Sequence, residues 1–354
     1  MAGAAVKGVA AAPLAAFIRA ALERLGADAF SAEHVARGLT ETSSRGVDSH
    51  GVRLFPHYAR ALEAGRVNGR PNFRFESRFE GAAVLHADDA FGHAAGVKAM
   101  DWAVERARRL GTASVAVRRS SHFGAAAYFA LRAAEQGLVG LAFTNADALV
   151  VPTRGKRPFF GTNPVAFAAP SSDGEPFCLD MATSQLNWNK VLRARESGEA
   201  LPPAAAVDAD GRETRDAAVA RALMPSGGYK GFGLGAMVDI LCASLTGGPC
   251  GPDMLPMFTS PIAARRDIGH YFLALEPAAF DEAGALARRV AELRARLRAE
   301  PPLDPAEPVL AAGDPETAAR RLRETDGVPV PEADRAAFAV VARKVGLTLP
   351  WEPV

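Results

Sequence analysis

The chain has 354 residues, of which 49% are hydrophobic, and a formal net charge of +1 from 41 basic and 40 acidic residues. This balance argues against a polybasic surface for nucleic acid, and the length allows two or three domains or one large unit. No run of 18 uncharged apolar residues occurs, so we expect no membrane span. The three cysteines (Cys178, Cys242 and Cys250) form no C-x-x-C pair, which favours a reducing compartment and a cytoplasmic protein.

The pattern of apolar residues predicts an α/β protein. Helical spacing predicts helices over residues 12–26, 31–43, 58–65, 92–111 and 126–137. Short apolar runs predict strands over 82–87, 112–117, 138–143 and 165–170, and their alternation with helices indicates some parallel strands. Further along we expect an exposed loop over 199–216, a helix entered through glycines over 231–248, a strand within 269–277, a helix over 279–300 and a short helix near the end.

The segment RRSSHFGAAAY, residues 118–128, places His122 between a predicted strand and a predicted helix. Ligands gather at the carboxyl ends of strands in open α/β sheets, and a free imidazole has a pKa of about 6.5, which suits proton transfer. The small residues after His122 would let a ligand come close to the backbone. The alternative is a structural histidine packed against Phe123.

A second histidine lies in a polar loop, Asp48-Ser49-His50-Gly51, with Arg53 close behind. His50 could carry or orient a proton with Ser49 as its hydrogen-bond neighbour, and Arg53 could hold a carboxylate with its guanidinium fork. The alternative is a loop whose aspartate and serine cap a helix. A serine hydrolase is disfavoured, because GVDSHG has one residue too many for the G-x-S-x-G motif.

Two further regions contain candidate ligand-binding residues. In PSGGYKGFGLGAMV (225–238), glycines around Lys230 suit a backbone that passes close to a cofactor, but neither a Walker A loop nor a G-x-G-x-x-G fingerprint is present. Small polar side chains beside apolar runs can bind a polar ligand or cap turns; they are Thr162, Asn163, Asp180, Thr183 and Ser184. No spacing typical of a zinc site occurs, so we expect no metal.

Taken together, these segments resemble the malate/L-lactate dehydrogenase-like family. This non-Rossmann group includes ureidoglycolate and sulfolactate dehydrogenases, diketogulonate reductase, and reductases of piperideine- and pyrroline-2-carboxylate. The resemblance rests on RGVDSHGVRLFPHY, SSHFGAAAYFALRAAEQGLVGLAFTN, FFGTNPVAFAAP, LDMATS and PSGGYKGFGLGAMVDIL, which span about residues 40–245. GHYFLALEP and AGDPETAARR extend it towards the end of the chain.

The resemblance implies a mixed-sheet α/β fold that binds a nicotinamide cofactor, NAD or NADP, and forms a homodimer. It divides the chain into an N-terminal helical part (1–75), a cofactor-binding α/β domain (76–269), and a C-terminal strand and helices (270–354) that pack back on the N-terminal part. The implied reaction moves a hydride between NAD(P)H and the C2 carbon of a small 2-oxo or 2-hydroxy acid. A cyclic-imine-2-carboxylate reductase and a non-catalytic nicotinamide-binding homologue remain alternatives.

The resemblance also implies roles for individual residues. His122 would be the proton donor and acceptor, supported by His50 and Ser49, and Arg53 and Thr162 would bind the substrate. The cofactor would contact Ser121, His122, Phe123, Gly124, Asp180, Met181, Ala182, Lys230, Gly313 and Asp314.

Three positions depart from the pattern of many relatives. Arg53 comes one residue earlier after the SHG motif, and Ala146 replaces a frequent serine. After LDMATS the chain continues QLNWNK, which puts a bulky Trp188 and a basic Lys190 where small or acidic residues are common. The specific substrate and the choice between NAD and NADP stay open at this stage.

Overall fold

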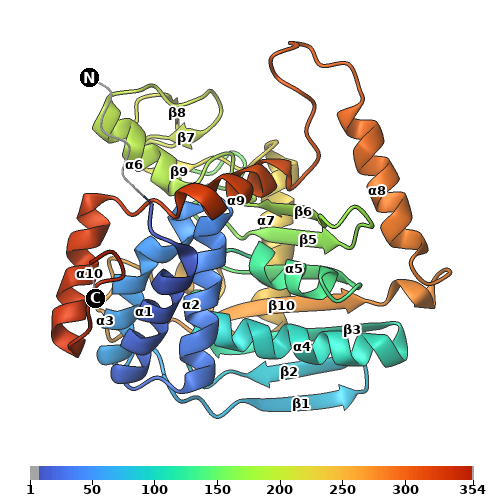
Figure 1. Cartoon of the computed structure of the whole chain (residues 1–354). Coiled ribbons are helices and arrows are strands. Elements are labelled where there is room, and N and C mark those ends of the chain that lie inside the picture. Colours follow the sequence, from blue (N-terminus) through green and yellow to red (C-terminus); the bar gives the residue numbers. More distant parts are fainter. Residues whose placement is uncertain (1–7, 353–354) are drawn as a thin grey trace.

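The computed structural model describes residues 8–352, and its centre is a seven-stranded mixed sheet (Figure 1). The strands follow the order β1 (Arg74–Phe79), β2 (Ala82–His86), β3 (Thr112–Ser120), β10 (Ile268–Leu275), β4 (Val139–Thr144), β5 (Val165–Ala169) and β6 (Phe177–Met181). Within this sheet β2 and β3 run parallel, and the other neighbouring strands run antiparallel. The α/β class and the mixed sheet are therefore confirmed.

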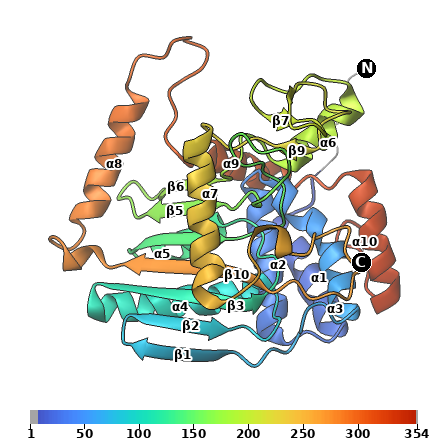
Figure 2. The same ribbon diagram turned by 180° about the vertical axis from the view of Figure 1, so that it is seen from behind.

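Helices cover both faces of this sheet. α4 (Gly92–Leu110) and α5 (Ala127–Ala134) pack on one face, and α7 (Tyr229–Cys242) packs on the other, as Figures 1 and 2 show. The central strands are apolar on both sides because both sides are covered. Val115, Phe129 and Phe272 are completely buried in the core between the sheet and the first two helices.

A second core lies beside the sheet and joins the two ends of the described chain. α1 (Ala11–Arg24), α2 (Ala29–Ser44) and α3 (Phe55–Glu63) pack with α9 (Asp314–Asp326) and α10 (Glu332–Val345). The ring centroids of Phe17 and Phe55 lie 5.9 Å apart, and those of Phe55 and Phe338 lie 4.9 Å apart. The C-terminal helices thus pack on the N-terminal part, and the loop that carries the SHG motif connects α2 to α3 through two short turns, η1 (Asp48–His50) and η2 (Val52–Leu54).

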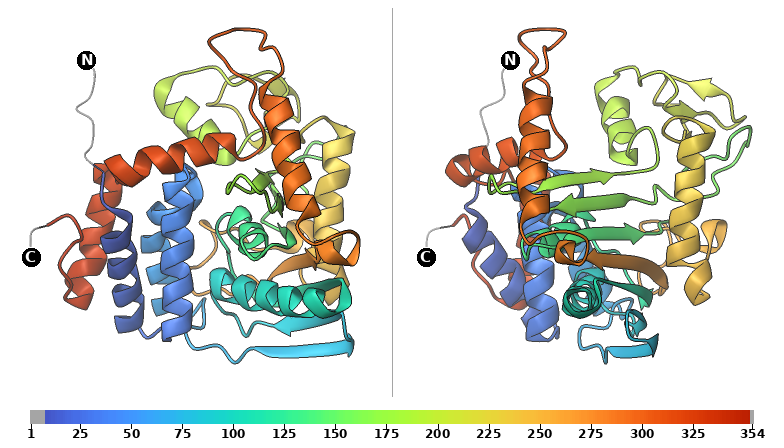
Figure 3. Two further views of the ribbon diagram at one scale, coloured as in Figure 1. Left: turned by 45° about the vertical axis from the view of Figure 1, so that its right-hand side comes forward. Right: turned by 90° about the vertical axis from the view of Figure 1, so that its right-hand side faces the viewer.

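Two appendages complete the described chain. α6 (Trp188–Ser197) packs beside a small sheet of β7 (Ala206–Val207), β8 (Glu213–Thr214) and β9 (Ala222–Leu223). α8 (Ala285–Arg298) stands at the margin of the molecule (Figure 3), held by the buried Arg294, which donates to Asp173 and Asp314. No helix among residues 8–352 is both long and apolar enough to span a bilayer.

Two expectations differ from the structure. The region 199–216 was expected to be an exposed loop, but it contains the short strands β7 and β8. The two residues of β7, Ala206 and Val207, are buried, and β7 lies beside α6 and β9. The expected division after residue 269 falls inside β10, which pairs with both β3 and β4 in the centre of the sheet. The strand of the expected C-terminal part therefore lies in the same sheet as the strands of the part expected to bind the cofactor.

Candidate active site

A buried histidine ties together the ends of three adjacent strands. His270 on β10 shares hydrogen bonds with Ser120 Oγ at the end of β3 and with Thr144 Oγ1 at the end of β4, both 2.8 Å long. Burial lowers the pKa of His270 to about 3, so the ring is neutral and can donate to one hydroxyl while it accepts from the other. The residues just beyond these strand ends are thereby brought to one edge of the sheet.

His122 lies at this edge, half-buried, with its Nδ1 atom 2.6 Å from the hydroxyl of Tyr58 on α3. Burial raises the pKa of Tyr58, so its phenol keeps its proton and can donate to Nδ1 of a neutral imidazole. The ring proton of His122 is then on Nε2. In the other neutral tautomer Nδ1 carries the proton and donates it to the tyrosine oxygen, which leaves Nε2 free to accept a proton. When His122 is charged, Nδ1 carries a proton too and donates it to the tyrosine oxygen.

His50 lies next to His122, with ring centroids 5.8 Å apart and planes 24° from parallel. The Nδ1 atom of His50 is 2.9 Å from Ser49 Oγ, so the neighbouring serine fixes the orientation of this ring. Burial lowers the pKa of His50, and burial followed by the charges of His50 and Arg266 lowers the pKa of His122 well below 6.5. Both rings are therefore neutral at pH 7 in the free protein.

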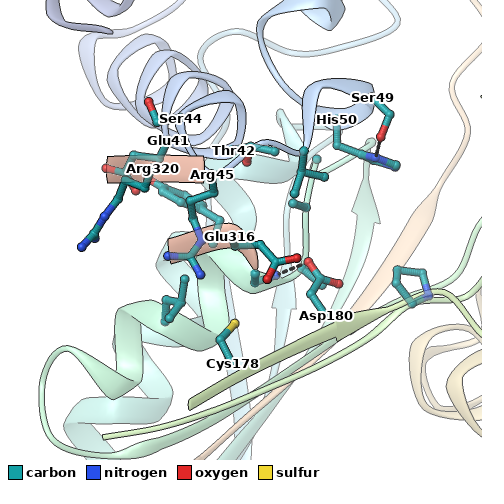
Figure 4. Close-up of a pocket in the computed structure, with 18 of the residues that line it drawn as sticks. Glu41, Thr42, Ser44, Arg45, Ser49, His50, Cys178, Asp180, Glu316 and Arg320 are labelled. Atoms are coloured by element: carbon teal, nitrogen blue, oxygen red, sulfur yellow. Dashed lines mark hydrogen bonds between the residues drawn. The ribbon is translucent and has the colours of Figure 1, made fainter. Parts of the chain in front are cut away.

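A cavity of about 440 Å³ opens beside His50 between α2, α5, β6 and α9 (Figure 4). One wall is the run Gly124 to Ala127, which has almost no side chains. Gly124 has φ +75°, and a Cβ there would come within 2.6 Å of Nε2 of the buried His93. Only glycine fits this position without a shift of its surroundings, and the small wall leaves room for a ligand.

Charged side chains from α2, α5, β6 and α9 line the cavity. The guanidinium of Arg45, half-buried at the end of α2, makes no hydrogen bond or ion pair with any residue of the 8–352 range. Asp180 on β6 accepts a hydrogen bond from the Ala127 backbone N–H at 2.8 Å. The protein atoms around Asp180 raise its pKa to about 6, although its carboxylate opens onto the cavity. Figure 4 shows Arg45, Asp180 and Glu316 converging on the same space.

Six of the expected site residues line this cavity: Ser49, His50, Gly124, Thr162, Asp180 and Ala182. The other eight do not line it, and His122 is one of them: it lies beside the lining residue His50. Ser121 accepts from the Gly92 N–H and donates to the Ala90 carbonyl, which holds the start of α4, and Phe123 is buried against the His270 ring. Met181 lies on β6 between two cavity residues and is half-buried.

Lys230 and the 313–314 pair also lie outside the cavity wall. Lys230 is exposed on the first turn of α7. Gly313 precedes α9 with φ +95°, and Asp314 binds Arg298, which lowers the pKa of Asp314 to about 2. From α9, the cavity is lined instead by Glu316 and Arg320. The cofactor roles expected for Lys230, Gly313 and Asp314 remain predictions.

Arg53 is not brought to the histidines or to the cavity. It is exposed on η2 and faces α10, where burial raises the pKa of Asp334 and the charge of Arg53 opposes that rise. Trp188 packs on α6 beside Arg195, and Lys190 is exposed on the same helix. From this region only Asn187 reaches the cavity, so neither Trp188 nor Lys190 fills it.

Four polar residues around the histidines and the cavity were not predicted from the sequence: Tyr58, Arg45, Asp147 and Arg266. Tyr58 and Arg45 stand inside the quoted motif RGVDSHGVRLFPHY, but no spacing rule links a tyrosine to a histidine 64 residues away. Arg266 forms a 2.5 Å ion pair with Asp147, and this pair depends on strand pairing. Among residues 8–352, no group of three or more His, Cys, Asp or Glu side chains can hold a metal ion.

Comparisons with known proteins agree with this architecture. The family model for malate/L-lactate dehydrogenase matches residues 9–338. The chain is 34% identical to the ureidoglycolate dehydrogenase (NAD(+)) of Escherichia coli K12 over 84% of each chain. It is 37% identical to the (2R)-3-sulfolactate dehydrogenase (NADP(+)) of Chromohalobacter salexigens over 74% of this chain and 79% of the other.

Two solved structures extend the likeness to the whole fold. The malate dehydrogenase of Entamoeba histolytica superposes with a TM-score of 0.91 at 26% identity, covering 98% of this chain and all (100%) of the other. The delta1-piperideine-2-carboxylate reductase of Pseudomonas syringae pv. tomato gives a TM-score of 0.84 at 30% identity, covering 95% and 99%. This chain, with its paired histidines beside a small-walled cavity, therefore belongs to the malate/L-lactate dehydrogenase family of oxidoreductases.

Proposed function

We propose that this protein uses NAD(H) or NADP(H) to interconvert a small 2-oxo acid and the corresponding 2-hydroxy acid. The observation that carries the proposal is the placement of His122. The Tyr58 hydroxyl forms a hydrogen bond with Nδ1 of His122. Two residues after His122, the run Gly124 to Ala127 begins to line the cavity. A proton donor and acceptor beside a binding cavity is what the reduction of a carbonyl requires in addition to a hydride.

The residues of the cavity fit a nicotinamide dinucleotide. Arg45 supplies an unpaired cation for the anionic diphosphate, and the small wall lets the cofactor approach the backbone. Asp180, Ala182 and Thr162 supply polar groups and backbone beside the same space. The bound cofactor supplies or accepts the hydride.

The protein's own contribution to the chemistry is proton transfer and orientation. In reduction, charged His122 donates the Nε2 proton to the oxygen on C2, where negative charge develops. In oxidation, neutral His122 with its ring proton on Nδ1 accepts that proton at Nε2, and Nδ1–H donates to the Tyr58 oxygen in both states. General acid–base catalysis of this kind contributes typically 10²–10⁴-fold. His50, fixed by Ser49, stacks beside His122 and keeps its ring in place.

The relatives support a small carboxylate substrate and leave the cofactor choice open. Their names specify malate, sulfolactate or ureidoglycolate, with NAD(+) in one case and NADP(+) in another. The reductase of piperideine-2-carboxylate among the solved structures favours a cyclic imine as the second candidate substrate. The three free cysteines suit a reducing compartment and support a cytoplasmic location.

A homodimer is part of the same proposal. The sequence of α7, YKGFGLGAMVDILC, contains only two charged residues and has no polar face, and apolar helices of this kind are buried on all sides. In the single chain one side packs on the sheet, whereas Leu234, Met237 and Ile240 are exposed. Figure 3 shows α7, in yellow, on the opposite face of the sheet from α4. A second copy of the chain would cover this surface.

The direct test is cofactor oxidation. Purified protein would be mixed with NADH or NADPH, and the nicotinamide absorbance followed with pyruvate, oxaloacetate, 2-oxoglutarate, diketogulonate and piperideine-2-carboxylate. We expect turnover with a 2-oxo acid. Turnover with the imine alone would favour the second candidate, and cofactor binding without any turnover would favour a non-catalytic homologue.

The role of His122 is tested with the best substrate of that panel. His122→Asn keeps a polar group of similar size but cannot transfer the proton. We expect kcat to fall about 10²–10⁴-fold while the cofactor still binds. Near-normal turnover in this variant would refute the assignment.

A further inference from the structure

The edge of the sheet that carries His122 also carries a buried arginine, Arg266. In the ladder between β10 and β3, Ile268 pairs with Ser120. At the same place the Arg119 N–H donates to Asp267 Oδ1 at 2.7 Å, so the segment that carries Arg266 lies beside the residues that lead into His122. Arg266 is 5% exposed, so it belongs to the inside of this edge and not to the molecular surface.

Two of the three nitrogens of the Arg266 guanidinium donate hydrogen bonds within the described chain. Its Nε donates to the Leu255 carbonyl at 2.7 Å, and its Nη2 donates to Asp147 Oδ1 at 2.5 Å. Its Nη1 makes no hydrogen bond with any residue of the 8–352 range. Some side-chain nitrogens of that range are both unpaired and fully shielded, but Nη1 of Arg266 is not one of them, so a ligand can reach it. A donor that stays unpaired and reachable inside an otherwise buried edge is available to a ligand.

The charge of Arg266 acts on the catalytic groups. Burial is the main cause of the low pKa of His122, and the positive charge of Arg266 lowers that pKa further. Burial raises the pKa of Tyr58, and the charge of Arg266 opposes this rise. It also contributes to the low pKa of His57, where burial comes first and Arg66 second. Arg53, in contrast, influences none of these residues and faces α10.

We propose that Arg266 binds the carboxylate of the substrate through its free Nη1 donor, the role expected for Arg53 from the sequence. The inference rests on the proposed function and specifies the substrate-binding residue of that same site. A carboxylate on Arg266 next to His122 leaves the adjacent C2 oxygen on the side of the imidazole. Guanidinium groups bind carboxylates in this directed way because their donors lie in one plane.

Arg66 provides a matched control for a purely structural role of Arg266. It is 4% exposed and anchors the same segment, because its nitrogens donate to the carbonyls of Met257 and Pro261 at 2.8 Å each. It is not among the groups that shift the pKa of His122. If Arg266 only holds the 255–266 segment in place, removal of either arginine should have the same effect.

The test measures carboxylate binding separately from turnover. The full-length protein, saturated with NADH or NADPH, is titrated by calorimetry with oxamate, an unreactive analogue of a 2-oxo acid, and with oxamide, its neutral counterpart. We expect oxamate but not oxamide to bind. Arg266→Gln should weaken oxamate binding at least about 30-fold, whereas Arg53→Gln and Arg66→Gln should change it less than about threefold.

The same variants are assayed with the 2-oxo acid that the wild type reduces, and Arg266→Gln should raise KM by a similar factor. The inference is overturned if the wild type does not bind oxamate, if Arg266→Gln binds it normally, or if Arg66→Gln or Arg53→Gln weakens it equally. If no 2-oxo acid is reduced but oxamate binding still depends on Arg266, the proposed reaction fails and the carboxylate site stands.

Discussion

At the scale of single residues, the hydrogen bond between Tyr58 and His122 occupies Nδ1 and leaves Nε2 to exchange a proton with substrate in the proposed reaction. Tyr58→Phe removes that bond and leaves the imidazolium without its Nδ1 partner. A hydrogen bond to a charged group contributes about 1.5–3 kcal/mol, so we expect kcat to fall roughly 10–100-fold. Tyr271→Phe, a change on β10 at the face towards α7, serves as the control. Unchanged turnover in Tyr58→Phe would contradict this role.

The low pKa of His122 fixes the direction of the pH dependence. Burial, with the charges of His50 and Arg266, holds that pKa well below 6.5. Reduction needs charged His122, so kcat/KM for reduction should decline as the pH rises above the lowered pKa. Oxidation needs the neutral ring, so its kcat/KM should rise through that pKa and then stay level. Profiles measured in both directions on one enzyme check the prediction, and a reduction rate that increases towards pH 8 would contradict it.

Asp180 makes cofactor affinity depend on pH in another way. Its pKa of about 6, raised by the surrounding protein, means that it gains a negative charge between pH 5 and pH 7. That charge faces the space proposed for the anionic diphosphate, so the Kd for NADH or NADPH should increase over this interval. Asp180→Asn keeps the shape and the acceptor for the Ala127 N–H, and should give a flat profile. Fluorescence titrations at several pH values measure both, and a parallel profile in the variant would refute the effect.

At the scale of elements, the proposed homodimer depends on the exposed apolar residues of α7. Ile240 is 59% exposed in the single chain, so Ile240→Asp should leave the fold intact and dissociate the dimer into monomers. Leu303→Asp, on the exposed loop after α8, is the matched control and should remain a dimer. Light scattering during gel filtration measures the mass. A wild-type monomer, or an Ile240→Asp dimer, would exclude α7 as the interface.

Elements that are covered on both faces were the easiest to predict. β3 and β4 are continuous apolar runs because helices pack on both sides of the sheet. β1, with the sequence RFESRF, was missed because it is an exposed strand in which charged residues interrupt any apolar run. The short strands β7 and β8 were also missed, since two-residue strands carry no periodicity.

At the scale of the whole molecule, the site residues that could be predicted from the sequence are those that stand within a short local motif. His122, His50 and Ser49 stand in two short segments and were recognised there. The contacts of Tyr58 and Arg266 join segments far apart in the chain, and they exist only because α3 packs against the sheet and β10 pairs with β3. No local pattern encodes such a register, so the structure was needed to find them.

The position of β10 also has a consequence for how the protein is made. Strands β1 to β3 and β4 to β6 form two halves of the sheet that share no hydrogen bonds with each other, and β10 joins them. During synthesis, β3 and β4 therefore present open edges until residue 275 has left the ribosome. Pairings over such long sequence separations form slowly, and open strand edges invite association with other chains. The nascent chain is consequently most vulnerable to aggregation during the interval before its central strand arrives.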